Sequence, residues 1–223
     1  MVPDDAAASA EKADLRAELL TARRARSAAD LDRARAAVRA HVLERAGGLK
    51  RVAAYEPLRT EPGSIELLAA LHARGVSVLV PLTLPDRDLD WTEWTPAGPG
   101  ARLGTAAIGT AGLVLVPALA VALDGTRLGR GGGSYDRALA RCAADAVLAA
   151  MVFDDEVVHW LPRESWDVPV HAAVTPSGCQ PSGRMASVTG RSHGARGTTS
   201  RSSSSNTSAT SFTVAAHRAS ARS

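Results

Sequence analysis

Three continuous apolar segments constrain the fold of this chain more than any other feature. They are VSVLVP (76–81), GLVLVP (112–117) and AVLAAMVF (146–153). A strand with one exposed face alternates polar and apolar residues, whereas these segments lack that alternation, which indicates burial on both faces. Strands of this kind occur in parallel sheets that are covered by helices on both sides.

Segments typical of helices lie before and between these strands. Residues 10–26 and 31–46 are rich in Ala, Leu, Glu and Arg, and Asp30 is expected to cap the second segment. Ser64 precedes a further helix over 65–74. The alternation predicts an α/β fold with a mostly parallel sheet and flanking helices, a Rossmann-like three-layer arrangement.

The remaining segments are shorter or less regular. Residues 52–55 and 168–175 are predicted to be short strands, and LDWTEW (89–94) a half-exposed strand because it alternates. Residues 95–112 are rich in Gly, Ala, Pro and Thr and are predicted to be a loop. A helix is expected over 135–144. In such sheets, ligands bind beyond the carboxyl ends of the strands.

The charge of the chain is unevenly distributed. Of its 223 residues, 26 are Lys or Arg and 23 are Asp or Glu, a net charge of +3. Six arginines and no acidic residue follow Ser177, so residues 1–177 hold 20 basic and 23 acidic residues and carry −3. We therefore expect a folded domain over 1–177 with no nucleic-acid surface, and a low-complexity, disordered basic tail over 178–223. That tail is interpreted either as a nucleic-acid arm or as a functionless extension.

Cysteine usage and the N-terminus bear on the compartment. The two cysteines, Cys142 and Cys179, form no CxxC motif and no metal-ligand spacing, which fits a reducing cytosol. The N-terminus lacks the pattern of a signal peptide, and no apolar stretch reaches the ~18 residues that span a membrane. We expect a cytoplasmic monomer without a membrane or nucleic-acid partner.

The strongest local motif is a glycine-rich segment, DGTRLGRGGGSYDR, over 124–137. Its glycines at 129, 131, 132 and 133 leave backbone N–H groups that an anion can approach closely. Arg127 and Arg130 can bind phosphate oxygens, and Asp136 would need a cation such as Mg²⁺ between itself and a phosphate. The motif is neither a P-loop nor GxGxxG, and a glycine run can also be a flexible loop. The buried strand before it and the helix after it favour a phosphate site.

The same segment resembles one family, the 5-formyltetrahydrofolate cyclo-ligases, also called methenyltetrahydrofolate synthetases. LVLVPALAVALDGTRLGRGGGSYDR (113–137) is similar to the family's strand ending in Val-Pro, followed by D…G.RLGRGxGYYDR. Residues 11–19, 52–81 and 151–176 agree with further family segments in order and spacing. The resemblance spans about residues 11–177.

The resemblance implies a nucleotide site, a folate site and a metal site. Tyr55, Glu56 and Glu61 would line the folate pocket. Asp136 and Asp167 would hold Mg²⁺. Arg130, as the catalytic residue, and Ser134 would also border the formyl group. The residues implied to bind ATP are Lys12, Arg16, Arg127, Leu128, Gly129, Arg130, Gly131, Gly132, Gly133, Ser134 and Tyr135.

Taken singly, some of these residues have simpler interpretations. Lys12 and Arg16 lie four residues apart and so share one helix face, but a pair with this spacing can also be two solvated surface charges. Asp167 can be read as a turn residue before Pro169, and Glu61 as an ordinary loop acid.

The chain departs from the family pattern at several positions. Ser134 stands where the family usually has Tyr, which removes an aromatic face from the folate side of the loop. Glu156 replaces the usual Gln, and His171 replaces an acid. Residues 95–112 lack the family's Gly-x-x-Glu-Pro turn.

The implied activity is the ATP- and Mg²⁺-dependent cyclisation of 5-formyltetrahydrofolate, with or without a polyglutamate tail, to 5,10-methenyltetrahydrofolate. ATP would phosphorylate the formyl oxygen to give an iminium phosphate, N10 would attack the carbon, and phosphate would leave. This chemistry needs positioning and charge neutralisation rather than a protein nucleophile. The alternatives are a non-catalytic nucleotide- or folate-binding homologue of the same fold, and another α/β enzyme with a phosphate ligand, such as a sugar-phosphate isomerase or coenzyme A transferase relative.

Overall fold

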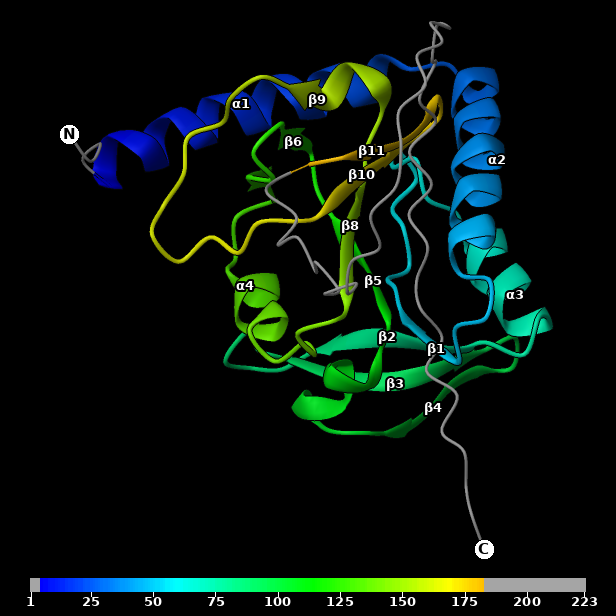
Figure 1. Ribbon diagram of the computed structural model, residues 1–223. Helices are drawn as coiled ribbons and strands as arrows, with labels where there is room; N and C mark the ends of the chain where they lie inside the picture. Colours follow the sequence, from blue (N-terminus) through cyan, green and yellow to red (C-terminus); the bar gives the residue numbers. More distant parts are fainter. Residues whose placement is uncertain (1–4, 183–223) are drawn as a thin grey trace, which may run out of the picture. The chain divides into compact units, whose positions relative to one another are not determined.

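The computed structural model describes residues 5–182, which form an eight-stranded sheet in the order β11-β10-β8-β5-β1-β2-β3-β4 (Figure 1). The five central strands are parallel, and antiparallel strands extend the sheet at both edges. This confirms the predicted mostly parallel α/β sheet. The strands are β1 (Arg51–Ala53), β2 (Ser77–Thr83), β3 (Leu89–Thr95), β4 (Gly98–Arg102), β5 (Leu113–Pro117), β8 (Val147–Met151), β10 (Ala172–Thr175) and β11 (Gly178–Pro181).

Helices cover both faces of this sheet. On one face, α2 (Ala28–Arg45) and α3 (Ile65–Ala73) pack against Leu113 and Leu115 of β5. On the other face, α4 (Ser134–Leu139) and the 3-10 helix η1 (Thr105–Thr110) pack near Val114 and Val116. Because alternate residues of β5 are buried in the two layers, the strand shows no polar alternation in its sequence.

A second, smaller sheet follows the end of β5. It has the order β7 (Arg127–Leu128), β6 (Ala120–Ala122), β9 (Val157–Val158), and the short helix η2 (Asp154–Glu156) precedes β9. The first helix, α1 (Asp5–Ala25), packs on this sheet through Leu15 and Leu19. In Figure 1, α1 crosses the molecule beside β6 and β9. The small sheet therefore brings α1 close to the glycine-rich segment that begins in β7.

Local details differ from the sequence-based expectations. The cap of α2 is Ser27 rather than Asp30, because the Ser27 hydroxyl accepts a hydrogen bond from the Asp30 amide at 3.1 Å. The helix predicted over 135–144 ends at Leu139. The strand β3 is mostly buried rather than half-exposed, since it lies between β2 and β4 and Trp91 packs in the core near η1.

Two predicted boundaries are corrected by the sheet. Residues 95–112 are not a loop throughout, because they contain β4 and η1. The tail predicted to begin at 178 starts with β11, which pairs with β10 through Val174 and Cys179. The rest of that predicted tail, 183–223, lies outside the described residues. None of the described helices combines the length and the apolarity that a membrane crossing requires.

Candidate functional site

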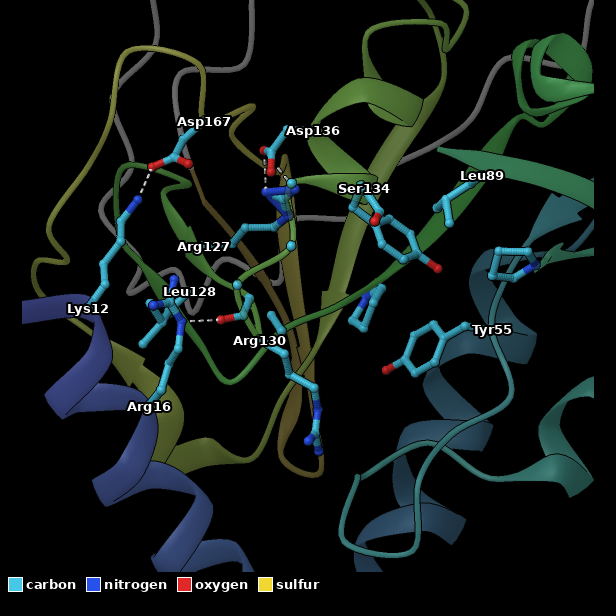
Figure 2. A pocket seen from close by; sticks show the side chains of 18 of the residues that line it. Lys12, Arg16, Tyr55, Leu89, Arg127, Leu128, Arg130, Ser134, Asp136 and Asp167 are labelled. Atoms are coloured by element: carbon cyan, nitrogen blue, oxygen red, sulfur yellow. Dashed lines mark hydrogen bonds and ion pairs between the residues drawn. The ribbon is translucent and has the colours of Figure 1, made fainter. Parts of the chain in front are cut away.

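A pocket of about 500 Å³ lies near the carboxyl ends of β1, β2 and β5, where Tyr55, Pro81 and Pro117 line it (Figure 2). From β1 the chain continues to β2 on one side, and β5 lies on the other. The strand order therefore reverses between β1 and β5. Open α/β sheets bind ligands at such a topological switch point.

The pocket gathers all but one of the residues predicted to bind ligands. Glu56 is exposed and does not line it, so its contact with substrate stays a prediction. The predicted residues that do line the pocket are Lys12, Arg16, Tyr55, Glu61, Arg127, Leu128, Gly129, Arg130, Gly131, Gly132, Gly133, Ser134, Tyr135, Asp136 and Asp167.

Arg127 forms a buried, fixed part of the wall. Its Nη2 lies 2.8 Å from Oδ1 of Asp136, and its Nη1 donates to the same oxygen at 3.1 Å and to the Val168 carbonyl at 3.2 Å. The Val168 amide also donates to Asp136 Oδ1, at 3.1 Å. Burial lowers the pKa of Arg127, and the Asp136 carboxylate opposes that effect.

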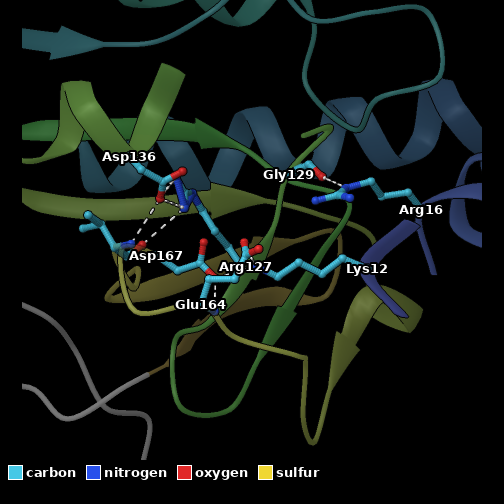
Figure 3. Close-up of polar contacts among 8 residues, drawn as sticks. Lys12, Arg16, Arg127, Gly129, Asp136, Glu164 and Asp167 are labelled. Carbon is cyan, nitrogen blue, oxygen red and sulfur yellow. Dashed lines mark hydrogen bonds and ion pairs between the residues drawn. The ribbon is translucent and has the colours of Figure 1, made fainter. Parts of the chain in front are cut away.

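Lys12 is almost completely buried, at 3% exposure, between two carboxylates (Figure 3). Its Nζ lies 2.6 Å from Oε2 of Glu164 and 2.6 Å from Oδ2 of Asp167. Asp167 Oδ2 also accepts the Glu164 amide at 2.8 Å, which closes a turn between the two acids. The sequence interpretation missed Glu164, and its position three residues before Asp167, in reach of a turn hydrogen bond, is the signal that could have identified it.

The glycine-rich segment over 124–137, called the glycine loop from here on, lines the pocket with the backbone of its glycines. Arg16 on α1 donates from Nε to the Gly129 carbonyl at 2.9 Å. Gly131 and Gly133 have φ of +85° and +66°, which residues with a Cβ rarely adopt. No hydrogen bond within the described part of the chain uses the amides of Gly131, Gly132 or Gly133. These amides are therefore available to an anion in the pocket.

The other end of the pocket is aromatic and apolar. Pro81, Leu89 and Pro117 line the pocket together with the buried ring of Tyr55 and the partly buried ring of Tyr135. Burial, and to a smaller extent the Glu61 carboxylate, raise the pKa of both tyrosines well above its usual value, so both hydroxyls stay protonated.

This aromatic end lies apart from Lys12 and Arg16. The Tyr135 hydroxyl is buried and has no hydrogen-bond partner among the described residues. Figure 2 shows Tyr55 and Leu89 on the opposite side of the view from Lys12 and Arg16. The arrangement suits a ligand with an anionic part and a flat, polar ring.

The two predicted metal ligands fit a magnesium ion that arrives with phosphates. Within the described residues, no group of three or more His, Cys, Asp or Glu side chains is arranged to hold a metal alone. Mg²⁺ usually keeps water and phosphate ligands and needs only one or two carboxylates. Asp136 and Asp167 both line the pocket, and each has one carboxylate oxygen that accepts no hydrogen bond from the described residues.

Comparison with known proteins identifies relatives of the whole described domain. Residues 8–176 match the model of the 5-formyltetrahydrofolate cyclo-ligase family. A protein of Mycolicibacterium smegmatis named 5-formyltetrahydrofolate cyclo-ligase is 40% identical over 143 residues, which cover 57% of this chain and 74% of that protein.

Two solved structures share the fold. The NMR structure of Aquifex aeolicus 5,10-methenyltetrahydrofolate synthetase superposes with a TM-score of 0.66 at 25% identity, over 82% of this chain and 96% of that one. A 5,10-methenyltetrahydrofolate synthetase of Mycoplasma pneumoniae superposes with a TM-score of 0.65 at 19% identity, over 74% of this chain and 99% of that one. The matched length shows that these proteins share the layered domain rather than a local motif.

Proposed function

The chain belongs to the 5-formyltetrahydrofolate cyclo-ligase family, and from this premise we propose that it cyclises 5-formyltetrahydrofolate to 5,10-methenyltetrahydrofolate at the expense of ATP. The family match covers residues 8–176 and so includes the pocket from Lys12 to Asp167. One observation carries the proposal. A single pocket joins a glycine loop with cationic neighbours to an aromatic end that contains a carboxylate.

The triphosphate of ATP would lie along the glycine loop. The amides of Gly131 to Gly133 make no hydrogen bond to the described residues, and Lys12, Arg16 and Arg127 line the same pocket. Cations and backbone amides stabilise phosphate charge through charge-assisted hydrogen bonds. Magnesium held by Asp136 and Asp167 would neutralise part of the charge on the phosphates.

The folate would occupy the aromatic end. Tyr55, Leu89 and Tyr135 offer flat and apolar surface, and the Tyr135 hydroxyl is free to hydrogen-bond a ring atom. Glu61 is nearly buried, at 4% exposure, and its carboxylate can accept hydrogen bonds from the N–H groups of a pterin. This placement directs the formyl group toward Arg130 and Ser134.

The reaction would proceed in two steps. The formyl oxygen attacks the γ-phosphorus of ATP, ADP leaves, and the formyl carbon becomes an iminium phosphate. N10 then attacks that carbon, the C–O bond to phosphate breaks, and loss of the N10 proton leaves the methenyl bridge. The side chain of Arg130 extends from the glycine loop toward Glu61. There its charge can stabilise the negative charge that develops on the transferred phosphoryl group.

An absorbance assay of the methenyl product tests this function. The full chain is incubated with 5-formyltetrahydrofolate, ATP and Mg²⁺, and product is expected only when all three are present. ATP binding without turnover would instead support a non-catalytic homologue, an alternative that Ser134 favours because it removes an aromatic side chain from the loop. Product without ATP would contradict the proposed mechanism.

A further inference from the structure

Arg23, on α1, is a completely buried cation that does not line the pocket. Its Nε and Nη2 each lie 2.7 Å from an oxygen of the Glu156 carboxylate. Nη2 also donates to the Ala118 carbonyl at 2.7 Å, and Ala118 lines the pocket. These contacts fix the guanidinium directly behind the pocket wall.

The third nitrogen of Arg23 faces the Glu61 carboxylate. Nη1 is buried, has no hydrogen-bond partner among the described residues, and lies 4.0 Å from Glu61 Oε1. Glu61 Oε2 accepts the Leu58 amide at 2.9 Å, and Arg130 approaches Oε1 from the pocket side at 3.5 Å. Glu61 Oε1 therefore lies between two guanidinium groups. That of Arg23 has no exposed surface, whereas the side chain of Arg130 is 45% exposed.

The two arginines act on Glu61 with unequal strength. Water screens the attraction of the exposed Arg130, whereas it has no access to Arg23. Among the described residues, the protonated side chains of Tyr55 and Tyr135 also interact electrostatically with this carboxylate, and Glu156 pairs with the other side of Arg23. The two arginines thus balance the charges of the Glu61 and Glu156 carboxylates. Of these two carboxylates, Glu61 is the one that lines the pocket.

We propose that Arg23 is a positioning residue that holds the Glu61 carboxylate in place at the folate end of the pocket. Arg23 acts through Glu61 and touches neither substrate. The inference rests on the proposed function, because it identifies the folate as the ligand that Glu61 contacts. It predicts that loss of Arg23 weakens folate binding selectively and leaves ATP binding intact.

The first experiment compares Arg23→Met with Arg24→Met, a matched control because Arg24 is the adjacent, exposed arginine of the same helix. Removing Arg23 is expected to raise the KM for 5-formyltetrahydrofolate about tenfold, the effect of one charge-assisted contact, while the KM for ATP changes less than about twofold. Arg24→Met is expected to match the wild type. An unchanged KM for the folate, or an equal rise for both substrates, would overturn the inference.

A second variant separates a loss of folate binding from a loss of stability. Arg23→Met removes the cation that pairs with the buried Glu156 carboxylate, which destabilises a fold strongly. Arg23→Met/Glu156→Met removes both charges, and we expect it to unfold near the wild-type temperature and to show the same rise in folate KM. A folded double variant with wild-type folate KM would contradict the role of Arg23.

A double-mutant cycle shows whether Arg23 acts through Glu61. Glu61→Gln alone should weaken folate binding, and adding Arg23→Met to it should cost less than about twofold more. An undiminished effect of Arg23→Met in the Glu61→Gln background would sink the inference. Calorimetric measurement of folate binding in the absence of ATP separates the role of Arg23 from the cyclo-ligase function. An inactive wild type would refute the cyclo-ligase function. The same cycle, measured as folate affinity, would still test the role of Arg23.

Discussion

Two arginines of the glycine loop, three residues apart, lie in opposite environments. Arg127 is buried at 6% exposure and bound to Asp136 and Val168. The side chain of Arg130 is 45% exposed, and its one polar contact with the described residues is at 3.5 Å to Glu61. Arg127 is therefore a rigid part of the wall, whereas Arg130 can change rotamer at little cost.

Replacing Arg130 should separate catalysis from stability. Arg130→Ala is expected to lower kcat/KM by roughly 30- to 1,000-fold, because a positioned cation contributes about 2–4 kcal/mol to a transition state. The unfolding temperature should stay at the wild-type value, since the side chain packs against little. Arg137→Ala, an exposed arginine of α4 outside the pocket, is the control. A wild-type rate for Arg130→Ala would remove this residue from the site.

Ser134 is half-buried, begins α4 and lines the pocket. Ser134→Tyr supplies an aromatic face next to the folate end and should lower the KM for 5-formyltetrahydrofolate about three- to tenfold, the effect of one aromatic contact. The KM for ATP should not change, and Ser134→Ala controls for loss of the hydroxyl. If Ser134→Tyr raised the folate KM, the loop would not face the folate in the proposed way.

Residues that belong to one continuous motif could be predicted from the sequence to lie together. Arg127, Arg130 and Asp136 belong to one segment, and the structure places all three at the pocket. Arg23 and Glu164 escaped the sequence interpretation. Their ion-pair partners are 133 and 152 residues away along the chain, and only the folded chain shows these pairs. For Glu164, the spacing to Asp167 was the one local signal.

At the scale of elements, long apolar strands were predictable and short ones were not. The strands β5 and β8 are buried at four of their five residues, and β2 is buried at residues 78–80. The strands β6, β7 and β9 contain only two or three residues each, too few for a periodic pattern. The sequence of β4 is GPGAR, whose glycines and proline normally indicate a loop, and it pairs only as an edge strand.

The conformation of the glycine loop can be tested with two neighbouring alanines. A Cβ at Gly131 would lie 3.3 Å from Arg16 Cζ, at a φ of +85°, so Gly131→Ala strains the backbone and displaces Arg16. We expect the KM for ATP to rise about tenfold or more. Gly132→Ala meets only the Ser134 hydroxyl at 3.8 Å and should raise it less than about threefold. Equal effects of the two substitutions would contradict this account of the loop.

The segment between β9 and β10 contains a tryptophan that can report ligand binding. Trp166 lines the pocket at 56% exposure, whereas Trp160 is 60% exposed and lies outside it. Ligand binding dehydrates a pocket-lining indole, so Mg-ATP should change the tryptophan fluorescence of the wild type and of Trp160→Phe. The change should be lost in Trp166→Phe. A signal that survives in Trp166→Phe would place the ligand away from this segment.

At the scale of the whole domain, segments that are far apart in the sequence, such as α1 and the glycine loop, line one pocket at the switch point. The ligand site expected at the carboxyl ends of the strands agrees with the position of the observed pocket, because the carboxyl ends of parallel strands lie at one edge of the sheet. The placement of α1 was not predictable in the same way. It depends on the small sheet of β7, β6 and β9, whose strands no pattern revealed.

The stability of the fold should depend on acid through Asp88, which pairs with Arg141 and so ties β3 to the segment after α4. The Arg141 hydrogen bond lowers the pKa of Asp88, so the folded state binds this proton less readily than the unfolded chain. The pair therefore stabilises the fold above about pH 4, the unfolded pKa, and that stabilisation is lost as the pH falls below it.

Urea denaturation of Asp88→Asn measures this contribution. At pH 7 the variant is expected to be about 0.5–1 kcal/mol less stable than the wild type. At pH 3 the difference should shrink, since the wild-type carboxyl is then increasingly protonated. Asp145→Asn, at an exposed aspartate without an ion pair in the structure, should have no such effect. A difference that is equal at both pH values would contradict the role of the ion pair.

The burial of Lys12 between Glu164 and Asp167 has a consequence for the proposed nucleotide site. The ammonium and its two carboxylates together carry a charge of −1, so a triphosphate would have to displace a carboxylate from Lys12 rather than meet an unpaired cation. If phosphate displaced Asp167, that carboxylate would lose its buried cation partner, which is unfavourable unless another cation binds it. We therefore predict that nucleotide and Mg²⁺ binding are coupled through this lysine, and that each ligand tightens the binding of the other by the same factor.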